Sequence, residues 1–199
     1  MINLAALILG YLIGSFPTAY LLAKAQGKNV FDLGSGSMGA MNTARNLNPQ
    51  TGIAVLLIDL GKGLLAVGLS KWLTQASLLP MLAATLGVIA GHAWSVYVGF
   101  RGGKALATTL GAALIVFPYV GISALACLIA IMIALRKRPS FAAIIAVACF
   151  PIITALVLSL RGESGSSFIY KVATVVLFSL LIIYKHLPDL IRELTPPSD

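Results

Sequence analysis

The sequence predicts an all-α integral membrane protein with about seven transmembrane helices and cytoplasmic glycine-rich loops. Hydrophobic residues make up 59% of the 199 residues and charged residues only 10%, and the mean hydropathy is +0.97. This composition is typical of a chain that lies in a bilayer. Apolar runs long enough to cross roughly 30 Å of hydrocarbon fill nearly the whole sequence. We therefore expect residues 1–199 to form a single transmembrane domain with no separate soluble domain.

Seven apolar runs are candidate spans. Their approximate ranges are 2–23, 51–72, 78–98, 105–117, 119–135, 141–160 and 168–184. The fourth run is short, and Pro118 separates it from the fifth. These two runs are either a hairpin of tilted or incomplete helices or one bent element, because proline interrupts a helix. The sequence therefore predicts seven spans or six.

The distribution of lysine and arginine predicts the orientation, because cytoplasmic loops retain an excess of cations. One side of the predicted spans receives ten of them: Lys24, Lys28, Arg45, Arg101, Lys104, Arg136, Lys137, Arg138, Lys185 and Arg192. The other side receives Lys71, Arg161 and Lys171, and Lys62 lies inside the second span. We expect the amino terminus outside, and the glycine-rich loops and carboxyl terminus in the cytoplasm. Topology and anionic headgroups explain the net charge of +8 without nucleic-acid binding.

Two glycine-rich cationic segments interrupt the apolar runs. The first reads GSGSMG from Gly34 to Gly39 and leads to Arg45, and the second reads FRGGK from Phe100 to Lys104. Glycine lets the backbone approach an anion and turn its N–H groups toward it, while arginine and lysine supply opposite charge. The pair predicts a site for a phosphorylated substrate at one membrane face. Turns and helix packing are the alternative for an isolated glycine pattern.

Several segments occur in an order that resembles the bacterial acyl-phosphate:glycerol-3-phosphate acyltransferases, the PlsY family. These are GSFPTAYL at 14–21, GSGSMGAMN at 34–42, Gly91-His92, FRGGK at 100–104 and Ala107-Thr108. The resemblance covers nearly the whole chain. It implies transfer of a fatty acyl group from acyl phosphate to the 1-hydroxyl of glycerol 3-phosphate, giving lysophosphatidate and phosphate in phospholipid synthesis.

The same resemblance implies a place in the bacterial plasma (inner) membrane, among membrane lipids. It implies no cofactor and no metal, and an enzyme that produces acyl phosphate is a candidate partner. The implied catalytic residues are Ser35, Lys104 and His186. The implied substrate- and phosphate-binding residues are Gly34, Gly36, Ser37, Gly39, Asn42, Arg45, Arg101, Gly102, Gly103, Asp189 and Arg192.

The chemistry of the implied reaction gives these residues different roles. Lys104 and Arg101 would stabilise negative charge on the leaving phosphate and the carbonyl oxygen. Ser35 is the best candidate for a hydrogen bond to the reacting phosphate. An acyl-serine intermediate is conceivable, but we favour direct transfer because acyl phosphate is already activated.

The segment from His186 to Arg192 resembles the third motif of the family, His-x-x-Asn-x-x-Arg. His186 would orient the acceptor or take its proton, and a cap of the last span is the alternative. Asp189 replaces the usual asparagine and would repel phosphate unless it is paired with Arg192 or with a loop cation such as Arg45 or Lys104, and we expect a compensated pair. Further departures from the family are Ser37 for asparagine, Met41 for threonine and Ala105 for glycine. They leave open a divergent paralogue with another donor or acceptor.

Other ionisable groups lie within the apolar runs. Asp59 and Lys62 are three residues apart in the second span, and we expect them to pair because each would be costly alone in hydrocarbon. His92 lies near Trp94 and Tyr97, and the family match suggests a structural or site-shaping role.

Two further classes of function stay open, a small organophosphate transporter and a non-catalytic scaffold. Transporters commonly carry repeats and bind substrate near the midplane. Here the candidate groups are expected at one face, which favours an enzyme.

Overall fold

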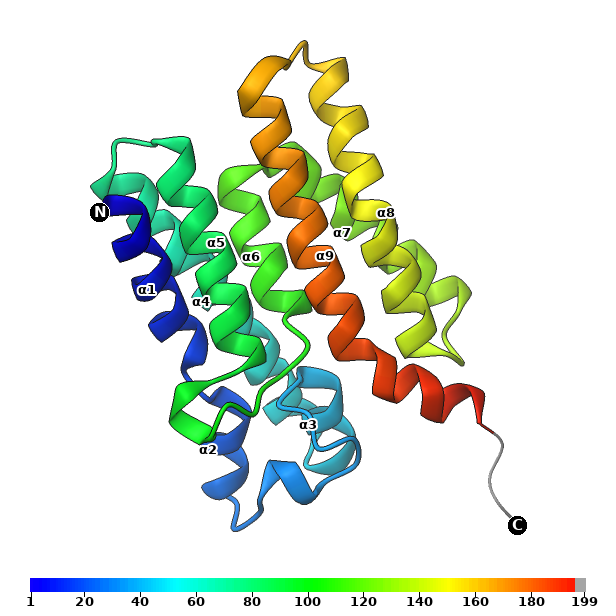
Figure 1. The fold of residues 1–199 in the computed structure, drawn as a ribbon. Coiled ribbons are helices and arrows are strands. Elements are labelled where there is room, and N and C mark those ends of the chain that lie inside the picture. Colours follow the sequence, from blue (N-terminus) through cyan, green and yellow to red (C-terminus); the bar gives the residue numbers. More distant parts are fainter. Residues whose placement is uncertain (196–199) are drawn as a thin grey trace. The chain divides into compact units, whose positions relative to one another are not determined.

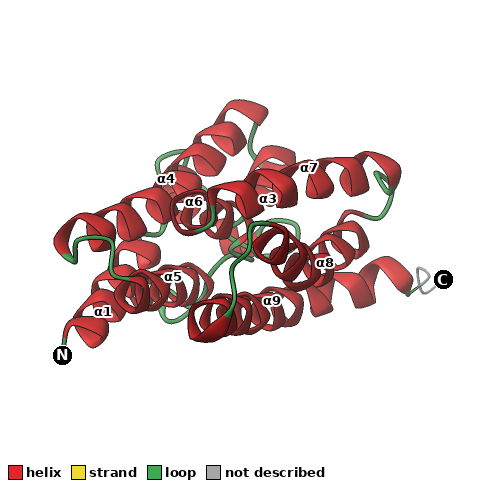
Figure 2. Ribbon diagram, turned by 90° about the horizontal axis from the view of Figure 1, so that it is seen from above, coloured by secondary structure: helices red, strands yellow, loops and turns green. Residues whose placement is uncertain are grey.

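The computed structural model describes residues 1–195, and within them the chain forms nine α-helices and two 3-10 helices (Figure 2). The elements are α1 Ile2–Ser15, α2 Thr18–Lys24, η1 Val30–Asp32, α3 Ala40–Asn46, α4 Pro49–Leu73, α5 Leu78–Ala93, η2 Val96–Val98, α6 Leu106–Val116, α7 Pro118–Ala134, α8 Pro139–Leu160 and α9 Gly165–Leu194. They form two compact units, Met1–Val116 and the part that begins at Phe117.

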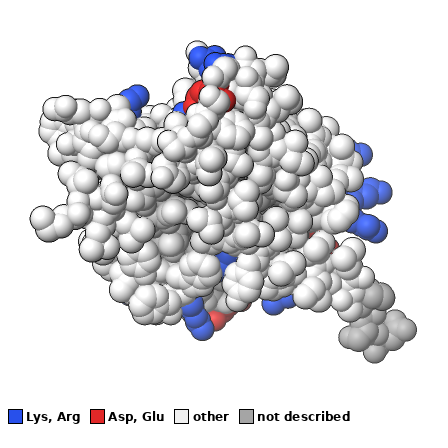
Figure 3. Space-filling model, turned by 45° about the horizontal axis from the view of Figure 1, so that its top comes forward, with Lys and Arg blue, Asp and Glu red and all other residues white. Residues whose placement is uncertain are grey.

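Each predicted apolar run contains a helix. Four candidate spans among the described residues are long and apolar enough to cross a membrane: 2–24, 49–73, 139–160 and 165–194. Shorter apolar helices lie at 78–93, 106–116 and 118–134. Large apolar side chains such as Leu57 and Leu160 are 61% and 78% exposed. Most of the face in Figure 3 is uncharged, as expected of helices that contact lipid.

The first predicted span is two helices. α1 ends at Ser15, and α2 begins at Thr18 after Phe16 and Pro17. Proline has no N–H, and it disfavours the helical region for the residue before it, which favours a break at Phe16. Similarly, Pro118 is the first residue of α7, and α6 ends at Val116. The fourth and fifth runs are therefore separate helices rather than one bent helix.

In the first unit, α1 and α5 lie side by side (Figure 1). A side chain on Gly10 would meet the backbone of Ala84, and one on Gly14 would meet that of Val88. The two helices therefore run in the same direction. Gly87 and Gly91 of α5 face the α1 backbone in the same way. Small residues allow this close packing, as in many membrane helix pairs.

The contact between α4 and α6 gives a stability prediction. A Cβ on Gly63 would meet the Thr108 carbonyl oxygen and the Ala112 nitrogen, whereas a Cβ on Gly61 would meet nothing within 4 Å. We expect Gly63→Ala to destabilise the protein by about 1–3 kcal/mol, because backbone atoms cannot move aside alone. Gly61→Ala is the matched control and should change stability little. Thermal unfolding in detergent measures both, and equal melting temperatures would contradict the packing.

In the second unit, α8 packs against both α7 and α9. Phe150 and Phe178 meet edge to face with ring centroids 6.3 Å apart. Arg161, after the end of α8, lies 3.8 Å from the ring centroid of Tyr119 in the first turn of α7. Glu163 pairs with Lys171 near the start of α9. Neighbouring helices of this unit are therefore joined both in the apolar interior and at one end.

Candidate functional site

Both glycine-rich segments lie at the same end of the first unit. α1 and α5 run in the same direction, so the segments that follow α2 and α5 leave from the same end, where α4 and α6 begin. The segments at this end, including the short helices α2 and α3, contain Lys24, Lys28, Arg45, Arg101 and Lys104, whereas Lys71 lies in the last turn of α4 at the other end. The predicted one-sided gathering of cations is therefore present within this unit.

Asn42 organises the first glycine loop. Its side-chain nitrogen donates to the carbonyl oxygens of Leu33 and Ser37 at 3.0 and 2.9 Å. Its side-chain oxygen accepts from the Ser35 backbone N–H and the Asn46 amide, both at 3.0 Å. The amide thus makes two donated and two accepted hydrogen bonds, which is its full capacity. The structure gives Asn42 a part in holding the loop, and direct contact with substrate stays a prediction.

The loop around Ser35 needs glycine on both sides. Gly34 has φ of +53° and Gly36 has φ of +66°, in the left-handed region that favours glycine. The Ser37 hydroxyl oxygen is buried and has no hydrogen-bond partner among the described residues. Buried polar atoms without a protein partner are uncommon, and they often bind a ligand or water. Ser37 is therefore a candidate donor to an anion in this loop.

The second glycine loop is tied to the end of α5. The Gly103 N–H donates to the His92 carbonyl oxygen at 3.0 Å. The Ser95 N–H donates to the Arg101 carbonyl oxygen at 3.0 Å, and the Ser95 hydroxyl donates to the Ser15 carbonyl oxygen at the end of α1. These bonds turn the chain back on α5 and place Lys104 directly before α6.

The two glycine loops contact each other through their flanking residues. The Arg101 guanidinium lies 4.8 Å from the ring centroid of Phe31, just before the first loop. Met38 of the first loop belongs to a buried cluster on which Val98, just before the second loop, also packs. A cation over an aromatic face is attracted by the ring quadrupole. The predicted juxtaposition of the two loops is therefore present, and Arg101 helps to make it.

A buried polar cluster lies beneath the second loop. The Lys62 ammonium nitrogen is 2.7 Å from an Asp59 carboxylate oxygen, which confirms the predicted pair. The same nitrogen donates to the Phe16 carbonyl oxygen at 2.5 Å, and Thr18 donates to Asp59 at 3.3 Å. His92 Nδ1 is 3.7 Å from the same Asp59 oxygen. Sequence reasoning missed these three partners. The available signal was Pro17, because a helix break there leaves the preceding carbonyl oxygen without its partner in the helix.

The third predicted segment lies in the second unit, in the last turns of α9. His186 is 3% exposed, and its Nδ1 lies 2.9 Å from the Ile182 carbonyl oxygen. Because a carbonyl only accepts, this contact places a proton on Nδ1. An Asp189 oxygen is 3.6 Å from an Arg192 nitrogen, which confirms a compensated pair.

Glu193 is a residue that sequence reasoning did not single out. Its carboxylate accepts from the backbone N–H groups of Ser140 and Phe141 at 2.8 and 3.2 Å, at the start of α8. A carboxylate at this position satisfies N–H groups that have no partner within the helix and meets the positive end of the helix dipole. It fixes the last turn of α9, which continues beyond Pro188 to Leu194. The signal in the sequence that could have pointed to this role is an acidic residue directly after Arg192.

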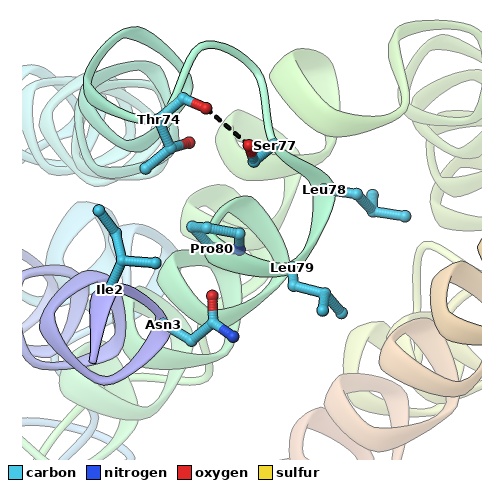
Figure 4. Close-up of a pocket in the computed structure, with 7 residues that line it drawn as sticks. All are labelled: Ile2, Asn3, Thr74, Ser77, Leu78, Leu79 and Pro80. Atoms are coloured by element: carbon cyan, nitrogen blue, oxygen red, sulfur yellow. Dashed lines mark hydrogen bonds between the residues drawn. The ribbon is translucent and has the colours of Figure 1, made fainter.

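A pocket of about 480 Å³ lies at the other end of the first unit, between the starts of α1 and α5 (Figure 4). Its lining includes Ile2, Asn3, Thr74 and Pro80, and Ser77 donates to the Thr74 carbonyl oxygen at 2.7 Å. None of the described residues that line it is charged. This pocket is therefore not a candidate for phosphate chemistry, and the glycine loops remain the candidate site.

Comparison with known proteins supports one family. The model of the family described as glycerol-3-phosphate acyltransferase matches residues 4–195. The glycerol-3-phosphate acyltransferase of Prochlorococcus marinus (strain NATL1A) is 38% identical over 191 residues, which are 96% of this chain and 93% of the relative. That of Desulforudis audaxviator (strain MP104C) is 36% identical over 187 residues, 94% of this chain and 89% of the relative.

Solved structures agree with the sequence relatives. The fold is similar to the crystal structure of PlsY (YgiH), an integral membrane glycerol 3-phosphate acyltransferase, in its glycerol 3-phosphate form, with a TM-score of 0.80 and 30% identity. The similarity covers 96% of this chain and 90% of that one. The lysophosphatidic acid form gives a TM-score of 0.78 and 29% identity over the same shares. This chain is thus an integral membrane protein that belongs to the glycerol-3-phosphate acyltransferase (PlsY) family.

Proposed function

We propose that this protein transfers a fatty acyl group from acyl phosphate to the 1-hydroxyl of sn-glycerol 3-phosphate, forming lysophosphatidate and phosphate. The observation that carries the proposal is the contact between two glycine-rich cationic loops at one end of the first unit. Donor, acceptor and leaving group all contain phosphate, and cations and backbone N–H groups are what phosphate prefers. The family match supports the acceptor, and a phosphorylated acyl donor fits the cations of the two loops.

The proposed chemistry is a direct displacement. The 1-hydroxyl oxygen of glycerol 3-phosphate bonds to the acyl carbon, and the bond from that carbon to the phosphate oxygen breaks. His186 Nε2, or an oxygen of the departing phosphate, takes the hydroxyl proton. Lys104 and Arg101 stabilise the charge on the carbonyl oxygen and on the leaving phosphate. Ser35, Ser37 and Arg45 hold a phosphate group in the first loop, and Arg192 draws the acceptor to the third segment.

Reconstitution in vesicles tests the activity. Purified protein receives acyl phosphate and glycerol 3-phosphate, and phosphate release and lysophosphatidate are measured together. Equal amounts of both support transfer. Phosphate without lysophosphatidate would indicate hydrolysis or another acceptor, as in a divergent paralogue. Glycerol 3-phosphate movement into sealed vesicles without acylation would instead support an organophosphate transporter, which the buried Asp59–Lys62 pair would fit.

Ser35 distinguishes direct transfer from a covalent route. We expect no acyl mass on the intact protein after mixing with acyl phosphate alone, because Ser35 serves as a hydrogen-bond donor. Ser35→Ala should then lower turnover without abolishing it. Intact-mass spectrometry before and after hydroxylamine treatment measures this. A stable, hydroxylamine-sensitive adduct on Ser35 would contradict direct transfer.

Asp189 provides a prediction about substrate binding. Because Asp189 is paired with Arg192, we expect Asp189→Asn to loosen this arginine and to lower activity, although it restores the usual family residue. A glycerol 3-phosphate titration should show a higher KM. Asp32→Asn, at an exposed acid near the first loop, is the control. A clear gain of affinity in Asp189→Asn would show that Asp189 repels the substrate phosphate.

We propose that residues 1–199 act as one transmembrane acyltransferase domain. We further propose about seven spans in the bacterial inner membrane, with the amino terminus outside and both glycine-rich loops and the carboxyl terminus in the cytoplasm. The excess of lysine and arginine at one end supports this orientation. Membrane lipids and an enzyme that supplies acyl phosphate would be the partners.

A further inference from the structure

We propose that Asp59, Lys62 and His92 form a buried positioning unit that sets the second glycine loop, and with it Lys104, for the proposed transfer. This inference rests on the proposed function for its catalytic consequence. The three residues are respectively 3%, 6% and 5% exposed. Nothing in the transfer chemistry itself employs them, yet each is a polar group kept inside an apolar unit at considerable cost.

The charged pair holds two pieces of backbone together. The Lys62 ammonium bridges the Asp59 carboxylate and the carbonyl oxygen of Phe16. The helix break at Pro17 takes this carbonyl out of the regular helical hydrogen bonding. Thr18, directly after the break, donates to the same carboxylate oxygen. Asp59 is therefore held by two donors, one from its own helix and one from α2. A carboxylate fixed in this way presents a defined negative charge to its third neighbour.

The third neighbour is His92 in the last turn of α5. Its Nδ1 is 3.7 Å from the Asp59 oxygen, which is longer than a direct hydrogen bond but close enough for the charge to orient the ring. The opposite side of the ring faces the glycine loop, because a Cβ on Gly103 would meet His92 Nε2 first. The imidazole thus lies between the buried carboxylate and the backbone of Gly103.

The loop is attached to the same residue by its backbone. The Gly103 N–H donates to the His92 carbonyl oxygen, and Lys104 is the next residue. His92 therefore fixes Gly103 both through its main chain and through its ring. Because misplacing a reacting group by about 1 Å can cost 100-fold in rate, the position of this ring matters for Lys104. In this proposal Asp59 and Lys62 act on the loop through His92.

The main test is the double variant Asp59→Leu/Lys62→Met. Replacing a buried ion pair with apolar residues of similar size is often neutral for stability. A merely structural pair would therefore leave the loop unchanged in this variant. The positioning role instead predicts that hydrogen–deuterium exchange of the segment 99–104 becomes about tenfold faster, with the melting temperature retained. Glu163→Gln/Lys171→Met, which removes another ion pair, is the matched control and should exchange like the wild type.

Kinetics link the loop to the proposed reaction. We expect kcat of the double variant to fall about tenfold or more, with a smaller change in the KM for glycerol 3-phosphate. If the double variant does not fold, His92→Phe and His92→Gln replace it. His92→Phe should speed exchange and lower kcat, and His92→Gln should rescue part of both because its polar amide can face Asp59 as the imidazole does.

The exchange and kinetic measurements separate two kinds of failure. Unchanged exchange at 99–104 in the folded double variant, or in His92→Phe, would overturn the positioning unit whatever the activity. Faster exchange with unchanged kcat would overturn its link to Lys104. If the wild-type protein transfers no acyl group, the proposed function fails, and the exchange result alone then supports or overturns the unit.

Discussion

Lys104→Ala is expected to lower kcat by about 100-fold or more while the protein stays folded. The change removes a cation from a partly buried position next to the developing negative charge of the proposed reaction. Charged groups in such positions stabilise the transition state most strongly. Lys104→Arg should restore only part of the rate, because a planar guanidinium has different reach and geometry from an ammonium. The measurement is the initial rate of phosphate and lysophosphatidate formation by purified protein in vesicles, with thermal unfolding as the check on folding.

Lys28→Ala is the control for this prediction. Lys28 is exposed and precedes the first glycine loop on the same side of the first unit, so it contributes similar long-range charge without belonging to the proposed site. Its loss should leave turnover close to that of the wild type. Near-normal turnover in folded Lys104→Ala would remove Lys104 from the proposed mechanism and would make it a topology charge.

Gly102→Ala is expected to lower kcat by a similar factor, about 100-fold, for a geometric reason. A Cβ on Gly102 would meet the carbonyl oxygens of both His92 and Ala93 at the end of α5. These are backbone atoms of a packed helix, so the glycine loop has to move instead, and it carries Lys104 with it. Rates in vesicles and the yield of folded protein should show a catalytic defect larger than any loss of stability.

Gly99 provides the matched control three residues earlier. It has φ of +66°, and a Cβ there would meet nothing within 4 Å. Asparagine tolerates the left-handed region better than other residues with side chains. Gly99→Asn should therefore retain most of the activity. Equal activity of Gly102→Ala and Gly99→Asn would mean that the loop does not pack against α5 as described.

Much of the architecture followed from local sequence patterns. The apolar runs identified the helices because length and hydropathy are local properties. The pairs Asp59–Lys62 and Asp189–Arg192 were predictable because residues three apart share a helix face. The break at Pro17 was missed because a run of apolar residues on both sides concealed it, although proline is a strong signal for a break.

Longer-range contacts could not be predicted from the sequence. Glu193 caps α8 at residues more than 50 positions away, and His92 meets an acid on another helix. Such contacts depend on how helices pack, which periodicity does not encode. Ala105 is an intermediate case. It replaces the usual family glycine, and the structure shows why glycine suits the position, since Ala105 has φ of +63°.

The spacing of Asp59 and Lys62 also bears on how the protein enters the membrane. Both residues lie on α4, so they can pair within one helix before any other helix is in place. A lone charge at the centre of a nascent segment would add roughly 2.5–3.5 kcal/mol to its insertion. A segment whose two charges pair within its own helix can insert into the bilayer before the neighbouring helices are in place. The carbonyl of Phe16 and the ring of His92 would then join the pair during assembly, so the same two residues would act first in insertion and afterwards in docking of the neighbouring helices.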